Sequence, residues 1–145
     1  MKLSTGLRDY MMATGAFKTG MDGSYVNIYS GTAPASPDDA IPGGATLLCT
    51  VSVGGTATGV TFEATATAGL LVKAAGETWE GTNLADGTAT WFRLAPTADA
   101  GASSPTALRV QGSVGQAGAD LNITNTSLTT GAVQSVDYFS ILKPE

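Results

Sequence analysis

Residues 87–94 read Gly87-Thr88-Ala89-Thr90-Trp91-Phe92-Arg93-Leu94, a run rich in β-branched and aromatic side chains. Such side chains are enriched in strands, where successive residues point to opposite faces of a sheet. The alternation places Phe92 and Leu94 on one face, and Trp91 and Arg93 on the other. We therefore expect one strand across residues 87–94, the best defined in the chain.

Shorter runs of the same kind lie on both sides of this strand, separated by turns that contain Gly and Asp. They cover residues 25–29, 47–53, 60–62, 69–73, 77–80, 107–111, 121–124 and 133–142. Many short strands with regular turns are typical of an all-β sandwich or barrel. A chain of 145 residues fits one domain, and we find no internal repeat or linker.

The N-terminal segment has a different period. Apolar residues recur there at three- and four-residue spacing, at Leu3, Leu7, Met11 and Met12. This spacing predicts a helix that Ser4 or Thr5 caps and that ends near Gly20. We assign residues 1–23 to an N-terminal helix or arm and residues 24–145 to a single β-sandwich domain. The apolar stripe either docks on its own domain or forms an arm that packs on a neighbouring subunit.

Composition argues against several function classes. The chain has no histidine, one cysteine, and a net charge of −5 with seven Lys and Arg scattered singly. Histidine is the commonest metal ligand and a frequent acid–base catalyst, while nucleic-acid binding needs a clustered basic face. No apolar run approaches the ~20 residues that span a bilayer, and the first residues lack the pattern of a secretory signal. We predict a non-enzyme without metal or cofactor, which binds neither nucleic acid nor membrane.

Individual motifs add little chemistry. Asp38-Asp39 lacks the spacing of a calcium loop, and the glycine-rich segment 112–118 is followed by a strand instead of the helix a phosphate cradle needs. Glu63, Glu77 and Glu80 give no spacing that supports a glycosidase pair. Exposed tryptophans on a β-sandwich stack on sugars in carbohydrate-binding modules, so Trp79 or Trp91 supports a glycan-binding alternative.

Five segments together carry a resemblance to a known group of proteins: Met1–Arg8, Ile28–Ser36, Gly87–Arg93, Val110–Gly115 and Asp120-Leu121. Over these segments the chain resembles small virion proteins of tailed bacteriophages, similar to the capsid cement or decoration proteins of short-tailed phages. The resemblance implies a jelly-roll-like β-sandwich that is made in the host bacterial cytoplasm and binds the outside of the phage head. It also implies that the protein forms a dimer or trimer and bridges subunits of the major capsid protein. A tail or baseplate component is the alternative.

Two segments are the candidate contacts with the capsid. The N-terminal segment supplies four apolar residues and the irregular loop 31–44 supplies three: Leu3, Leu7, Met11, Phe17, Pro34, Pro37 and Ile41. On this hypothesis, deletion of residues 1–17 leaves a folded domain that no longer binds heads.

Overall fold

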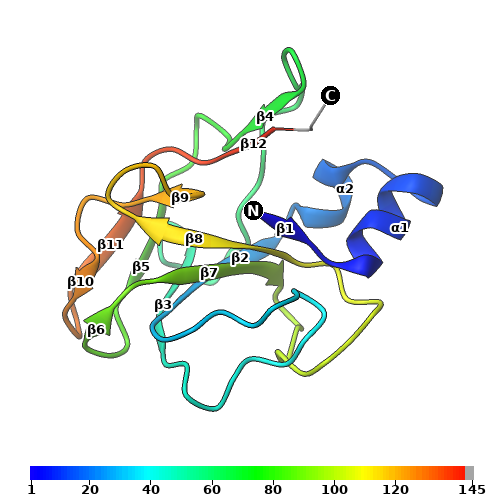
Figure 1. Cartoon of the computed structure of the whole chain (residues 1–145). Helices are drawn as coiled ribbons and strands as arrows, with labels where there is room; N and C mark the ends of the chain where they lie inside the picture. The colour runs from blue at the N-terminus through cyan, green and yellow to red at the C-terminus, as the bar shows by residue number, and fades with distance from the viewer. Residues whose placement is uncertain (143–145) are drawn as a thin grey trace.

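A computed structural model describes residues 1–142 of the chain (Figure 1). The last three residues of the predicted domain 24–145 lie outside the described residues. Two helices, α1 (Thr5–Ala13) and α2 (Phe17–Met21), follow a two-residue strand. The strands are β1 (Lys2–Leu3), β2 (Ser24–Tyr29), β3 (Leu47–Val53), β4 (Leu70–Val72), β5 (Trp79–Thr82), β6 (Gly87–Thr88), β7 (Trp91–Pro96), β8 (Val110–Gly115), β9 (Leu121–Asn122), β10 (Ser127–Leu128), β11 (Val133–Val136) and β12 (Ser140–Leu142).

Eight of these strands form one sheet. Its order is β1-β8-β7-β2-β3-β5-β11, with β9 paired to β8. All pairs along this order are antiparallel, and β9 alone runs parallel to its neighbour. The pairs β6–β10 and β4–β12 form two small additional sheets. The prediction of an all-β sandwich with a short N-terminal helix is confirmed.

The predicted strand across 87–94 is divided into two. β6 pairs with β10, whereas β7 pairs with β2 and β8. Between them, the Ala89 N–H donates to the Thr126 carbonyl at 2.8 Å, and the Thr90 N–H donates to the Tyr29 carbonyl at 2.9 Å. The chain therefore changes its pairing partner within a single run of β-forming residues, which alternation alone does not reveal.

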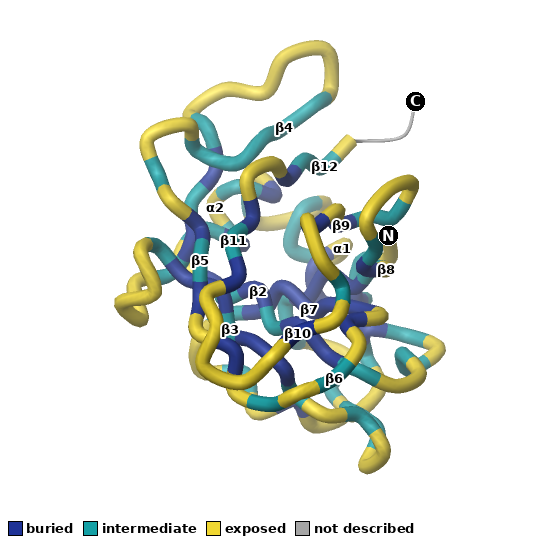
Figure 2. The backbone as a smooth tube through the Cα atoms, turned by 90° about the vertical axis from the view of Figure 1, so that its left-hand side faces the viewer, coloured by how far each residue is buried: buried dark blue, intermediate teal, exposed yellow. Residues whose placement is uncertain are grey.

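The N-terminal segment forms two helices instead of one. Ser4 caps α1 by accepting a hydrogen bond from the Leu7 N–H at 3.1 Å, in the usual manner of a serine N-cap. The helices pack on the same hydrophobic core as the strands, through Leu7, Phe17 and Met21. Figure 2 shows this arrangement as dark segments gathered beneath exposed loops.

The two faces of the sheet differ in chemistry. Val26 and Ile28 of β2 face the same core as Phe92 and Leu94 of β7. On the opposite face, Trp91 stacks on Tyr29 with ring centroids 4.4 Å apart, and the Arg93 guanidinium lies 5.7 Å from the Trp91 ring centroid. The predicted separation of residues 91–94 between two faces is confirmed. Both faces are buried, because loops cover the second one.

Candidate functional site

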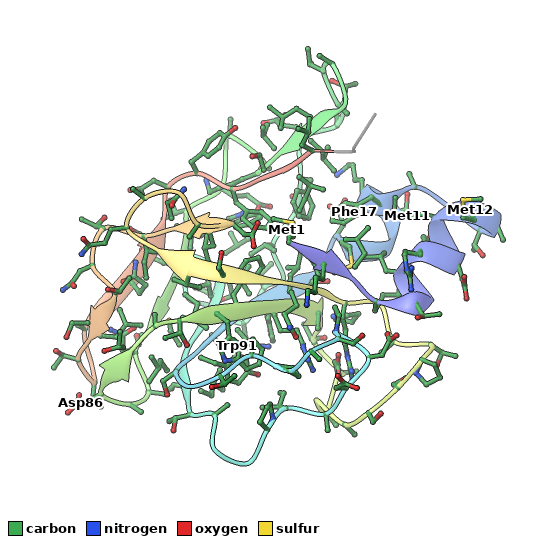
Figure 3. The ribbon with its side chains drawn as sticks, in the orientation of Figure 1. Met1, Met11, Met12, Phe17, Asp86 and Trp91 are labelled. Atoms are coloured by element: carbon green, nitrogen blue, oxygen red, sulfur yellow. The ribbon has the colours of Figure 1, made fainter. Side chains whose placement is uncertain are left out.

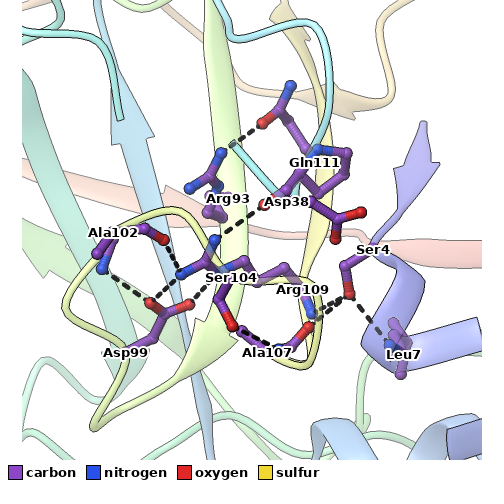
Figure 4. A network of polar contacts seen from close by, with 12 residues as sticks. Ser4, Leu7, Asp38, Arg93, Asp99, Ala102, Ser104, Ala107, Arg109 and Gln111 are labelled. Atoms are coloured by element: carbon purple, nitrogen blue, oxygen red, sulfur yellow. Dashed lines mark hydrogen bonds and ion pairs between the residues drawn. The ribbon is translucent and has the colours of Figure 1, made fainter. Parts of the chain in front are cut away.

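The irregular loop 31–44 is attached to the sheet by three buried side chains of β7, β8 and the residue before β8 (Figure 4). Arg93 donates to the Asp39 carbonyl at 3.2 Å, and Arg109 donates to the Pro37 carbonyl at 3.0 Å. Gln111 donates to the Pro34 carbonyl at 2.8 Å. Backbone carbonyls need partners when they are removed from water. The loop therefore has a defined conformation although it contains no regular structure.

A buried ion pair anchors the next loop to the same place. Arg109 Nη2 donates to Asp99 Oδ1 at 2.7 Å and to the Ala102 carbonyl at 2.7 Å. Burial by itself raises the pKa of Asp99, but hydrogen bonds from Arg109 and Gly101 and the charge of Arg109 outweigh it. The net pKa of Asp99 is below its ordinary value, so the carboxylate stays charged at neutral pH.

Helix α1 is joined to both loops at its N-terminus. The Ser4 hydroxyl donates to the Ala107 carbonyl at 2.7 Å and accepts from the Arg109 N–H at 2.9 Å. The Asp38 carboxylate accepts from the Thr5 N–H at 2.9 Å and from its hydroxyl at 2.6 Å. The hydrogen bond from the Thr5 hydroxyl is the main reason that the pKa of Asp38 is lowered. The two segments proposed as capsid contacts are therefore attached to each other.

An apolar groove of about 620 Å³ lies between the two helices and the β4–β12 pair. Leu3, Met11 and Phe17 form one wall and Leu71 and Ile141 the other. Figure 3 shows Met11 and Phe17 close together, whereas Met12 projects from the outer side of α1. The volume and apolar lining are in the range of ligand and peptide sites. At its margin, Met1 and Leu142 are 42% and 66% exposed.

Of the seven predicted contact residues, five lie at or near the surface and two do not. Leu3 and Met11 are half-buried and line the groove, and Phe17 lines it from a largely buried position. Pro34 and Ile41 are half-buried in the loop 31–44. These five residues remain candidates for contact with a partner.

Leu7 and Pro37 need correction, because their side chains offer no surface to a partner. Leu7 is completely buried in the core. Pro37 is a buried residue of the loop 31–44, and Arg109 binds its carbonyl. Deletion of residues 1–17 would also remove Leu7, Phe17 and the Ser4 cap from the fold. The expectation that this deletion leaves the domain intact is therefore not supported by the packing.

The tryptophans of the glycan-binding alternative are both buried. Trp79 and Trp91 are 1% and 2% exposed. Trp79 packs edge-on against Phe62 with ring centroids 5.6 Å apart, and Trp91 is covered by the loop that Arg93 holds. Neither ring presents a face on which a sugar can stack, so this alternative loses its proposed residues.

The other motifs have structural partners. Glu77 accepts from the Thr61 hydroxyl at 2.6 Å and from the Trp79 indole at 2.7 Å. Burial raises the pKa of Glu77, but these hydrogen bonds outweigh it, and the net pKa lies below its ordinary value. The Cys49 thiol is buried, which raises its pKa to about 11. Within residues 1–142, no group of three or more His, Cys, Asp or Glu side chains is arranged to hold a metal ion.

The residues that hold the loops or complete the groove leave almost no local pattern in the sequence. Arg93, Arg109 and Gln111 are isolated polar residues in strand patterns, and their partners lie up to 77 positions away. Leu71 and Ile141 belong to strands that pair across 70 positions of sequence. One local signal exists: Arg93 lies two residues from Trp91 in an alternating strand, which places a charged side chain on the same face of the sheet as the tryptophan.

Comparison of the chain with protein-family models, with curated proteins and with solved structures gives no match. Among residues 1–142, no helix combines the length and apolar character needed to span a bilayer.

Proposed function

We propose that the protein is a capsid cement protein of a tailed bacteriophage, which binds the outside of the head and bridges subunits of the major capsid protein. The observation that carries the proposal is the apolar groove beside α1, together with the ordered loop 31–44 that is joined to the N-terminus of the same helix. An apolar concavity bordered by exposed side chains is typical of a protein interface. The resemblance to phage virion proteins names the partner.

The ordered loops suit this role energetically. Ordering a flexible loop on binding reduces affinity, whereas a loop already held in place avoids that cost. Here Arg93, Arg109 and Gln111 hold the loop 31–44 in the free protein. A protein that binds only the assembled shell stabilises it by mass action, by about 2.7 kcal/mol at 100 times its dissociation constant.

The number of copies per purified virion, measured by quantitative mass spectrometry, tests the location. Copies in a simple ratio to the major capsid protein support a cement protein on the head lattice. A few to a few dozen copies assign the protein to the tail or baseplate, and absence from the particle overturns both.

A pair of adjacent substitutions tests the surface. Met11 lines the groove, whereas Met12 is 88% exposed on the outer side of α1. We expect Met11→Gln to reduce binding to undecorated heads at least about tenfold, the effect of losing about 1.4 kcal/mol of contact. Met12→Gln is the matched control and is expected to bind like the wild type. Equal binding by both variants, with unchanged thermal melting, would exclude the groove from the interface.

A further inference from the structure

We infer that the free edge of β11 pairs with β11 of a second copy, so that two copies form one continuous sheet around a two-fold axis. This inference goes beyond the proposed capsid role and concerns the isolated protein. β11 is the last strand of the large sheet and pairs with β5. Figure 1 shows it on the side of the sheet away from α1 and α2, so such pairing leaves the groove free.

The direction of the hydrogen-bonding groups follows from the neighbouring contacts. The Asn83 N–H donates to the Ala132 carbonyl at 2.8 Å, and Gln134 lies opposite Gly81 in the ladder. Because these groups alternate along a strand, residues 132, 134 and 136 face β5, and Val133 and Ser135 face outward. Within residues 1–142, neither outward N–H donates to another segment. The Ser135 carbonyl accepts from the Gln134 side chain at 2.7 Å and keeps one lone pair.

This edge lacks the usual protection against another strand. Natural edge strands are commonly blocked by charged residues, proline or a bulge, and β11 has the uncharged sequence Val133-Gln134-Ser135-Val136 without a break in its register. The edge strand also exposes an apolar side chain, because Val133 is 65% exposed. The missing partner is therefore an extended strand with apolar residues.

A second copy satisfies these requirements without placing like charges opposite each other. In an antiparallel arrangement with Gln134 on the axis, Val133 of one copy faces Ser135 of the other, and the reverse holds by symmetry. All the outward groups of both strands then form hydrogen bonds. Asp137 lies opposite Gly131 in this register, so its direct cross-strand neighbour is uncharged. The Asp86 carboxylate is bound by Thr130, one residue further along.

Sedimentation equilibrium of the full chain, from about 1 μM to about 1 mM, tests the pairing with two substitutions at one position. Ser135→Pro removes the outward N–H and leaves the ladder with β5 intact, because proline is tolerated on an edge when its nitrogen faces away from the neighbour. Ser135→Ala keeps the N–H and is the control. We expect wild type and Ser135→Ala to form dimers. Ser135→Pro is expected to dimerise at least roughly tenfold more weakly, or not at all, because the dimer loses two hydrogen bonds.

Amide hydrogen exchange of the wild type provides a measurement that does not depend on a variant folding. The Val133 and Ser135 amides are expected to exchange quickly in dilute solution and to become protected as the dimer forms. A monomer at every concentration, a trimer, or a dimer in which these amides stay unprotected would overturn the inference. None of these results bears on whether the protein binds phage heads, which the copy number in virions tests separately.

Discussion

The two faces of β7 are equally buried but are stabilised in different ways. Phe92 and Leu94 are completely buried in an apolar core, in which Phe92 meets Phe139 edge-on with centroids 5.6 Å apart. Trp91 and Arg93, on the other face, lie under loops that are held by directional hydrogen bonds. Apolar burial is not directional and tolerates repacking, whereas each polar contact on the second face has one specific partner.

This difference separates the residues that stabilise the fold from those that shape its surface. The apolar face accounts for the sheet, and the polar face determines where loop 31–44 and the loop around Asp99 lie. A substitution on the first face is expected to lower global stability, whereas one on the second face is expected to release loops as well.

The largest expected effect is on the apolar face. Phe92→Ala removes a completely buried ring from the centre of the sheet and is expected to lower the free energy of unfolding by about 4 kcal/mol. Urea denaturation followed by fluorescence measures this loss. Tyr138→Ala is the control, because Tyr138 is 60% exposed and its loss is expected to cost less than about 0.5 kcal/mol. Similar losses for both variants would contradict the assignment of the core.

A somewhat smaller loss is expected on the polar face, with a local consequence. Arg109→Met leaves the Asp99 carboxylate, whose side chain is 9% exposed, without its partner. Breaking a buried pair in this way costs about 3 kcal/mol. In Arg109→Met, limited proteolysis in mild denaturant is also expected to cut the loops 31–44 and 96–105. Wild type is expected to resist at the same denaturant concentration, and so is Phe92→Ala when it is compared at equal global stability.

The double variant Arg109→Met, Asp99→Asn provides the control. It removes the unpaired charge, so it is expected to regain part of the stability while the loops remain susceptible to protease. Recovery of protease resistance together with stability would show that the loops do not depend on the hydrogen bonds from Arg109.

The same contrast explains what could be predicted from the sequence. Alternation identified β2 and β3 to within one residue and separated Phe92 from Trp91, because a sheet face leaves a local period of two. The groove and the loop contacts could not be predicted, since they depend on pairings such as Leu71 with Ile141 and on single residues such as Arg109. Leu7 was assigned to a partner because a helical stripe looks the same whether it packs within a chain or between chains.

The smallest expected effect is at the junction of α1 and loop 31–44, and it depends on pH. Asp38→Asn weakens two hydrogen bonds from Thr5 and removes a negative charge from the N-terminus of α1, which is expected to cost about 1 kcal/mol at neutral pH. The pKa of Asp38 is lower in the folded protein than its ordinary value of 3.8. Its contribution is therefore fully present above about pH 4 and is lost as the pH falls through the lowered pKa. The unfolding free energies of wild type and Asp38→Asn, measured by urea denaturation at successive pH values, should converge in acid. Asp9→Asn, an exposed substitution on α1, controls for the change in net charge. If the difference in unfolding free energy between wild type and Asp38→Asn stayed constant down to pH values where carboxylates are protonated, the carboxylate would not hold the junction.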